Sequence, residues 1–324
     1  MAIDKLKKKK KKRNSRWVRN SAYEQLGPFM STLKADQVSS EFLKYYTSIP
    51  SLSSTEADNE CFHHCAFNFP GVVLTLGQSR WVELYDTFDL LVHKAFKSRK
   101  TLAHSIHDIA NILGTQLTEQ YLLSAIDFFL KDVDDVRVGV LSNFWKILRV
   151  LGDTKRKEYL CMLWELGSEP DINWRIRLLL AELSHGFFMH VNIYIYIHIC
   201  VYVHIFLLLL LLLNGMWNGG KDRQLDDIYW LYEPEQVMDQ LVPLAFQLCD
   251  DRMAEVRCVM AVAIAELVRF FQTKGTAEQL QQILAKCYVL HSAKTYSKRL
   301  LFVLIFLFVL NFFFFFFLKK KKKR

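Results

Sequence analysis

Few stretches of this chain bring together residue types that could do chemistry. Cys61-Phe62-His63-His64-Cys65 offers four soft metal ligands within one short segment. A structural zinc site needs a second ligand pair about 12–20 residues further on, and the sequence from 66 to 92 contains no Cys or His. We therefore interpret these side chains as lining a helix, and the sequence predicts no metal site here.

Two other segments resemble binding motifs but lack a residue that the motif requires. Gly215 to Asp222 fits the phosphate-loop pattern G-x-x-x-x-G-K, but Asp222 stands where a Ser or Thr must hold magnesium, and polyleucine precedes it where a strand should. The acidic run at 132–135 is no calcium loop, because its sixth position is Arg137. Motifs of the types G-x-S-x-G, H-E-x-x-H and paired C-x-x-C do not occur. The sequence thus predicts no enzyme and no cofactor.

The charge and the cysteines narrow the class of protein further. The net charge of +9 comes from two end segments, 1–13 and 319–324, which hold 14 of the 42 basic residues. The body carries 28 basic and 32 acidic residues, which argues against a nucleic-acid partner, because such a partner needs a basic folded surface. Seven scattered cysteines fit reduced thiols. We expect a cytoplasmic protein, with the nucleus as a second location.

The elements that position these residues are predicted to be helices. Glycine and proline are scarce, at 12 and 6 residues, and apolar residues recur every three or four positions, as in amphipathic helices. Examples are Leu102, Ile106, Ile109 and Leu113. Short polar breaks are expected between paired helices, at 114–116, 152–154 and 274–276.

A basic turn recurs before these helices at a fixed period. The interval from Arg99 to Arg137 equals the interval from Arg137 to Arg175. An interval of this length is typical of helical repeat arrays, in which each helix pair buries its apolar face against its neighbours. The next arginine, Arg257, follows only after more than twice that interval, and leaving out 183–223 makes the interval close to the other two. We therefore interpret 183–223 as an insert within a helix.

Acidic residues precede the arginines by five or six positions. Asp132, Glu169 and Asp251 each stand at such a turn. In a stacked array the acid of one turn can pair with a base of the neighbouring turn. The simpler alternative is that an acid near a helix N-terminus favours the helix dipole, by about 0.3–1 kcal/mol. Neither role is catalytic.

Two apolar segments admit two interpretations. Phe187–Leu213 has no charged residue, and Leu300–Leu318 is apolar except for Asn311. Each is long and apolar enough to span a bilayer, and the second resembles a tail anchor. Yet the alternation of Ile or Val with Tyr, His or Cys from 193 to 205, and the runs of Leu, Phe and Lys, are what simple-sequence DNA would encode. Our hypothesis is that 183–223, the far C-terminal stretch and 1–13 are unspliced or misassigned sequence.

Several longer stretches resemble the protein phosphatase 4 regulatory subunit 1 family of HEAT-repeat proteins. They are Ser15-Arg16-Trp17-Val18-Arg19, Leu26–Thr32, His64–Gly77, Arg99–His107, Phe129–Leu141 and Asn173-Trp174-Arg175. The resemblance covers about 14–182 and 224–299. It implies an all-α fold, a HEAT-type α-solenoid of antiparallel helix pairs. The spacing and composition of this chain predict that the solenoid is interrupted by an apolar insert and ends in an apolar helix.

The composition and spacing of the chain, together with the resemblance, predict a domain organisation. We expect a basic tail at 1–13, a partial repeat at 14–33, a linker at 34–60, repeats at 61–182, the insert at 183–223, repeats at 224–299 and an apolar, lysine-rich tail at 300–324. Compared with the family, the N-terminal repeats are missing, the acidic spacer has shrunk to 34–60, and the chain stops within a repeat.

The function implied is that of a non-catalytic scaffold. Such a subunit binds the phosphatase 4 catalytic subunit and directs it to phosphoprotein substrates. Alternatives are another HEAT adaptor, similar to a nuclear-transport receptor, and a membrane-anchored adaptor that uses Phe187–Leu213 and Leu300–Leu318. The candidate protein-binding residues lie in two inter-helix turns: Asp132, Asp134, Asp135, Arg137, Asp250, Asp251 and Arg257.

Overall fold

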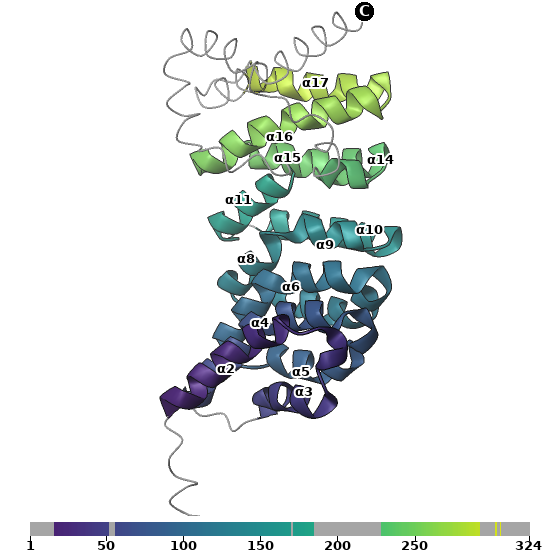
Figure 1. The fold of residues 1–324 in the computed structure, drawn as a ribbon. Coiled ribbons are helices and arrows are strands. Elements are labelled where there is room, and N and C mark those ends of the chain that lie inside the picture. The colour runs from purple at the N-terminus through teal and green to yellow at the C-terminus, as the bar shows by residue number, and fades with distance from the viewer. Residues whose placement is uncertain are drawn as a thin grey trace, which may run out of the picture. The chain divides into compact units, whose positions relative to one another are not determined.

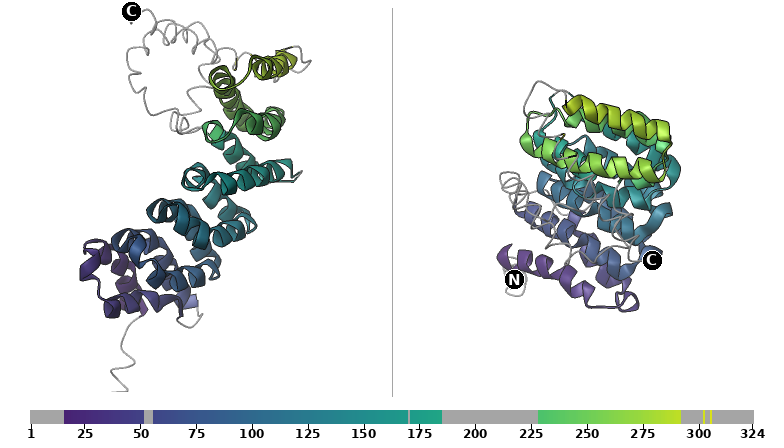
Figure 2. Two further views of the ribbon diagram at one scale, coloured as in Figure 1. Left: turned by 90° about the vertical axis from the view of Figure 1, so that its right-hand side faces the viewer. Right: turned by 90° about the horizontal axis from the view of Figure 1, so that it is seen from above.

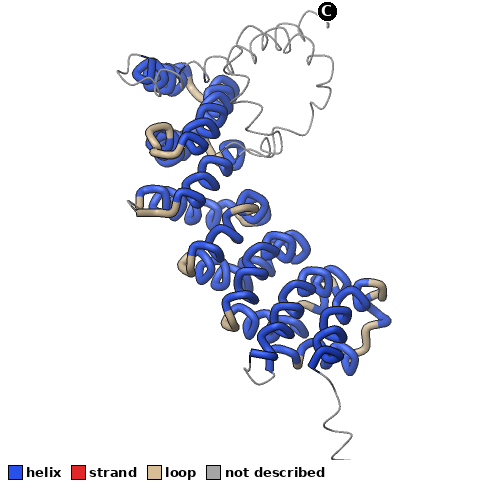
Figure 3. The backbone as a smooth tube through the Cα atoms, turned by 90° about the vertical axis from the view of Figure 1, so that its left-hand side faces the viewer, coloured by secondary structure: helices blue, strands red, loops and turns tan. Residues whose placement is uncertain are grey.

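The computed structural model describes residues 16–51, 56–169, 171–184 and 228–291, together with 302 and 305. The chain divides into two compact units, residues 1–152 and 153–324. All the regular structure in the described residues is helical (Figure 3). Within each unit the helices stack in succession (Figure 2), which confirms the predicted all-α solenoid class of fold.

Unit 1 is built around one continuous row of helices (Figure 1). In this row α2 packs on α4, α4 on α6, and α6 on both α8 and α9. The row comprises α2 (Arg16–Ser31), α4 (Glu56–Leu76), α6 (Phe96–Leu117), α8 (Asp134–Leu141) and α9 (Phe144–Val150). The helices that alternate with it along the chain are α3 (Ser40–Thr47), α5 (Val82–Val92) and α7 (Leu123–Leu130). Short turns join them: η1 (Ala35–Gln37), η2 (Ile49–Ser51), η3 (Gln78–Arg80) and the wider η4 (Thr118–Leu122).

Unit 2 has its own alternation of helices. Its elements are α10 (Asp153–Ser168), α11 (Trp174–Leu183), η7 (Ile228–Leu231), α14 (Pro234–Gln236), η8 (Val237–Leu241), α15 (Val242–Leu248), α16 (Ala254–Thr273) and α17 (Ala277–His291). Although the insert separates them in sequence, α11 packs directly on α16 (Figure 1). In turn, α16 packs on α15 and α17.

Glycines end α4 and interrupt α6 near its end. Gly77 follows α4 with φ 71°, and Gly114 breaks the helical backbone of α6 with φ 70°. A residue with a side chain is strained at such angles, whereas glycine is not. The interval from 77 to 114 is close to the period of the arginines. The predicted break at 114–116 is therefore present as a kink inside α6.

Packing between neighbouring helices supplies most of the stability. Phe69 of α4 lies 6.2 Å from Trp81 and 5.8 Å from Phe88 of α5, measured between ring centroids, and all three side chains are buried. Helices of this length are marginal in isolation, so their apolar faces must be covered by neighbours.

The predicted linker 34–60 contains an ordered helix, which corrects the expectation of a loop. The Ser39 hydroxyl accepts a hydrogen bond from the Phe42 N–H and caps α3. Leu43 and Tyr46 are buried, and the Tyr46 hydroxyl donates to the Cys65 carbonyl at 2.6 Å. The serine-rich composition around 48–55 is typical of loops, but these two buried side chains dock the short helix that precedes it.

The apolar segments fall largely outside the described residues. Phe187–Leu213 and the phosphate-loop-like Gly215–Asp222 lie wholly outside them, as does Leu300–Leu318 apart from Phe302 and Ile305. Among the helices that the structure does describe, none combines the length and the hydropathy needed to cross a bilayer.

Candidate functional site

The first predicted turn is tied into the array by a two-pronged ion pair. Arg99 of α6 donates from Nε to Asp132 Oδ2 at 2.6 Å and from Nη2 to Oδ1 at 3.2 Å. The Asp132 side chain is only 9% exposed. Burial alone raises the pKa of Asp132, but hydrogen bonds from Arg99 and the Val133 N–H outweigh burial, so its pKa lies below the usual value. The Asp132 side chain therefore holds neighbouring repeats together through its ion pair with Arg99.

The other acids of this turn reach the surface. Lys100 Nζ contacts Asp135 Oδ2 at 2.8 Å, and Arg137 lies 3.7 Å from Asp134. The Asp134 and Asp135 side chains are 47% and 44% exposed. Of the unit 1 candidates, these two carboxylates are the ones that a partner protein can reach.

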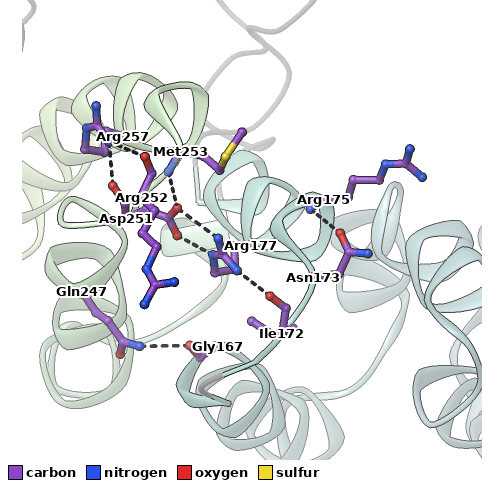
Figure 4. Close-up of polar contacts among 10 residues, drawn as sticks. All are labelled: Gly167, Ile172, Asn173, Arg175, Arg177, Gln247, Asp251, Arg252, Met253 and Arg257. Carbon is purple, nitrogen blue, oxygen red and sulfur yellow. Dashed lines mark hydrogen bonds and ion pairs between the residues drawn. The ribbon is translucent and has the colours of Figure 1, made fainter.

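The second predicted turn has the same construction (Figure 4). Arg177 of α11 donates from Nε to Asp251 Oδ2 and from Nη2 to Oδ1, the latter at 3.2 Å. Asp251 Oδ1 also accepts the Met253 N–H at 2.8 Å, just before α16 begins. Arg257 donates to the Asp251 carbonyl at 2.7 Å. The neighbouring Asp250 is exposed.

One contact identifies the equivalent arginines of the repeats. Each donates from Nη1 to the main-chain carbonyl five positions earlier: Arg99 to Lys94, Arg177 to Ile172, and Arg257 to Arg252. The repeat arginine of α11 is therefore Arg177, which corrects the predicted Arg175. Arg175 lies in the first turn of α11, exposed, with its guanidinium 5.8 Å from the Trp174 ring.

The sequence separation between the paired residues gives the length of the insert independently of the arginine period. Arg99 and Asp132 are 33 residues apart, whereas Arg177 and Asp251 are 74 residues apart. Leaving out 183–223 makes the second separation equal to the first. The same two atoms of each arginine meet the same two atoms of each aspartate. The two halves of the interrupted repeat are thus packed in the register of an uninterrupted one.

The row of unit 1 also places histidines beside one another. His63 Nδ1 lies 3.0 Å from the Thr101 hydroxyl, which links α4 to α6. Burial, followed by the nearby His64 and Lys97, lowers the pKa of His63. Burial, followed by Lys100, lowers the pKa of His104. The imidazoles of His63 and His104 are accordingly neutral near pH 7.

The Cys61–Cys65 motif lies in α4 as a helix-lining segment. Cys61 Sγ donates to Asn20 Oδ1 at 3.1 Å, and burial raises the pKa of Cys65 to about 12. Among the described residues, no group of three or more His, Cys, Asp or Glu side chains is arranged to hold a metal ion. What the turns offer instead is a set of partly exposed charges on a rigid helical framework, suited to binding another protein.

Sequence reasoning missed Lys100, Arg177 and Thr101. The signal that could have found the first two is the recurring spacing between a base in one helix and an acid in a later turn, rather than the distance between arginines. For Thr101 no pattern in the sequence distinguishes it from other polar helix residues.

Residues 65–166 match the family model of the protein phosphatase 4 regulatory subunit 1 middle domain. Serine/threonine-protein phosphatase 4 regulatory subunit 1 of Mus musculus is 36% identical over 242 residues, which are 74% of this chain and 21% of that protein. The Homo sapiens protein of the same name is 36% identical over 238 residues, which are 72% of this chain and 21% of that protein. The chain thus spans about a fifth of the length of these relatives.

Among solved structures, a designed armadillo repeat protein is similar with a TM-score of 0.40 and 13% identity, covering 82% of this chain and 99% of that one. The family model covers the stretches Arg99–His107, Phe129–Leu141 and, except for its first residue, His64–Gly77. Residues 65–166 therefore match the middle domain of protein phosphatase 4 regulatory subunit 1, and the chain is similar to a protein of that name over 74% of its length.

Proposed function

We propose that this chain is a non-catalytic regulatory subunit that binds a protein phosphatase 4 catalytic subunit and directs it to phosphoprotein substrates in the cytoplasm. The observation that carries the proposal is 36% identity, over 74% of the chain, to proteins named as regulatory subunits of that phosphatase. The fold is compatible with such a role, since stacked helix pairs present extended surfaces for other proteins.

The turns supply candidate contacts for this binding. Asp132 and Asp251 are engaged within the array, so the partner is expected to meet their exposed neighbours Asp134, Asp135 and Asp250. These carboxylates call for basic or hydrogen-bonding groups on the facing surface of the catalytic subunit.

Co-purification tests the proposal. The tagged full-length chain should retain a phosphatase 4 catalytic subunit, and the eluate should release phosphate from phosphoserine and phosphothreonine peptides. A small GTPase of the nuclear-transport type is offered to the tagged chain as the alternative partner and should not be retained. Retention of the GTPase with no phosphatase activity in the eluate would replace this proposal with the transport-adaptor alternative.

A further inference from the structure

Helix α4 carries two large apolar side chains that are exposed and do not pack in the core. Phe67 is 68% exposed and Leu74 is 69% exposed, although α4 is the middle helix of three and is covered by α2 and α6 on its flanks. The two residues are seven positions apart, so they lie on one face of the helix, about two turns from each other.

Gly71 lies between them on the same face. Its backbone is helical with no positive φ, and a Cβ atom added to it would meet nothing within 4 Å. Neither conformation nor packing requires glycine here, and glycine weakens a helix interior. The absent side chain leaves a depression between Phe67 and Leu74. We call Phe67, Gly71 and Leu74 the α4 stripe.

The surroundings of the stripe are polar and mostly paired within the chain. Before Phe67, α4 carries the half-buried His63 and His64. The nearest carboxylate on α4, Glu60, accepts a hydrogen bond from Asn20 at 2.8 Å. Burial lowers the pKa of His63, so its imidazole is neutral near pH 7, and the Glu60 carboxylate is paired within the chain. Both features lower the cost of removing water from the apolar centre, as in the centre of a protein interface.

The stripe is continuous with the turn proposed above. Lys100, on α6, pairs through its ammonium with Asp135 of the turn. One turn earlier on the same helix, the exposed Lys97 lies close enough to His63 of α4 to contribute to its lowered pKa. A partner that reaches Asp134 and Asp135 therefore meets Lys97 and then the stripe on the same row of helices.

We propose that the catalytic subunit docks on the α4 stripe, with an apolar side chain seated on Gly71 between Phe67 and Leu74 and a carboxylate facing Lys97. This rests on the proposed function and names the surface that serves it. Such apolar side chains at helical spacing match the way that a helix is recognised by an apolar groove.

The test measures binding of the purified phosphatase 4 catalytic subunit to the immobilised full-length chain. A Phe67→Ser/Leu74→Ser double variant should bind about thirtyfold more weakly, and Gly71→Leu, which fills the depression, about tenfold more weakly. Val82→Ser is the matched control, because Val82 is 72% exposed on α5; its affinity should stay within about twofold of wild type.

The variants change exposed positions, and their circular dichroism spectra and urea midpoints verify the fold. Gly71→Leu should unfold no earlier than wild type, since leucine is the better helix former. Equal binding by wild type and both stripe variants would overturn the stripe while leaving the proposed function intact. An equal loss in Val82→Ser would also overturn it. If the wild-type chain fails to bind the catalytic subunit, the proposed function fails and the stripe with it.

Discussion

Replacing Asp251 by alanine is expected to lower the free energy of unfolding of unit 2 by about 3 kcal/mol. The Asp251 side chain is 5% exposed and Arg177 is 21% exposed. The variant leaves a largely buried guanidinium without its carboxylate, and the Met253 N–H without its acceptor. This loss of free energy of unfolding is at the lower end of the range for buried ion pairs, because water still reaches part of Arg177. Equilibrium urea unfolding followed by circular dichroism measures the change.

An exposed pair in the same unit provides the control. Lys155 and Glu158 lie 2.8 Å apart, but their side chains are 40% and 57% exposed, so Glu158→Ala should cost less than about 0.5 kcal/mol. A double-mutant cycle of Arg177→Ala and Asp251→Ala should show coupling of about 2 kcal/mol. Equal effects of Asp251→Ala and Glu158→Ala would show that the turn pair does not join the repeats.

Gly27→Ala is expected to destabilise unit 1 by about 3 kcal/mol, against the ordinary preference of helices for alanine. Gly27 is buried in α2, and an added Cβ would lie 2.2 Å from Asn68 Cβ and 2.4 Å from its Cγ. Asn68 cannot move aside easily, because its Nδ2 donates to the Glu24 carbonyl at 3.1 Å. The helices α2 and α4 must therefore separate. Urea unfolding of the purified variant measures the loss.

The same substitution at Gly71 is the matched control, with the opposite sign. Gly71 also lies within a helix, but its added Cβ meets nothing within 4 Å, so Gly71→Ala should stabilise by about 0.5–1 kcal/mol. Stabilisation by both substitutions would mean that α2 does not pack closely on α4 at Gly27.

The class of fold could be predicted from the sequence because the patterns that indicate it recur along the chain. Apolar spacing of three and four, polar breaks and basic residues before successive helices recur several times, so a single misleading residue, such as Arg175, does not change the interpretation. Asp132 and Asp251 were placed in laddering turns on this basis, and both lie there. Local composition was less reliable: the polar residues of 34–60 suggested a linker, but the burial of Leu43 and Tyr46 makes Ser40–Thr47 a packed helix.

Details that depend on the angle around a helix could not be predicted. Arg175 and Arg177 are both basic and two positions apart, and only the start of α11 at Trp174 determines which one faces Asp251. The α4 stripe was missed for a related reason. Phe67 and Leu74 fit an apolar helical pattern as core residues would, and their exposure depends on which face of α4 its two neighbours cover.

Residues 183–223 interrupt one repeat in the sequence, and the two halves of that repeat are packed as if the insert were absent. A variant that lacks 183–223 puts this to the test. The deletion joins Glu182 to Gln224 and shortens the connection between α11 and the following helices roughly tenfold. Closing a loop costs about 0.6 kcal/mol per doubling of its length, so the variant should be more stable than the full chain by up to roughly 2 kcal/mol.

The measurement is the Arg177–Asp251 coupling in the deletion variant, obtained from the same double-mutant cycle by urea unfolding. We expect cooperative unfolding and a coupling equal to that in the full chain, about 2 kcal/mol. Loss of the coupling, or a variant that no longer unfolds cooperatively, would contradict this expectation, because the register shared with the Arg99–Asp132 pair would then depend on the insert.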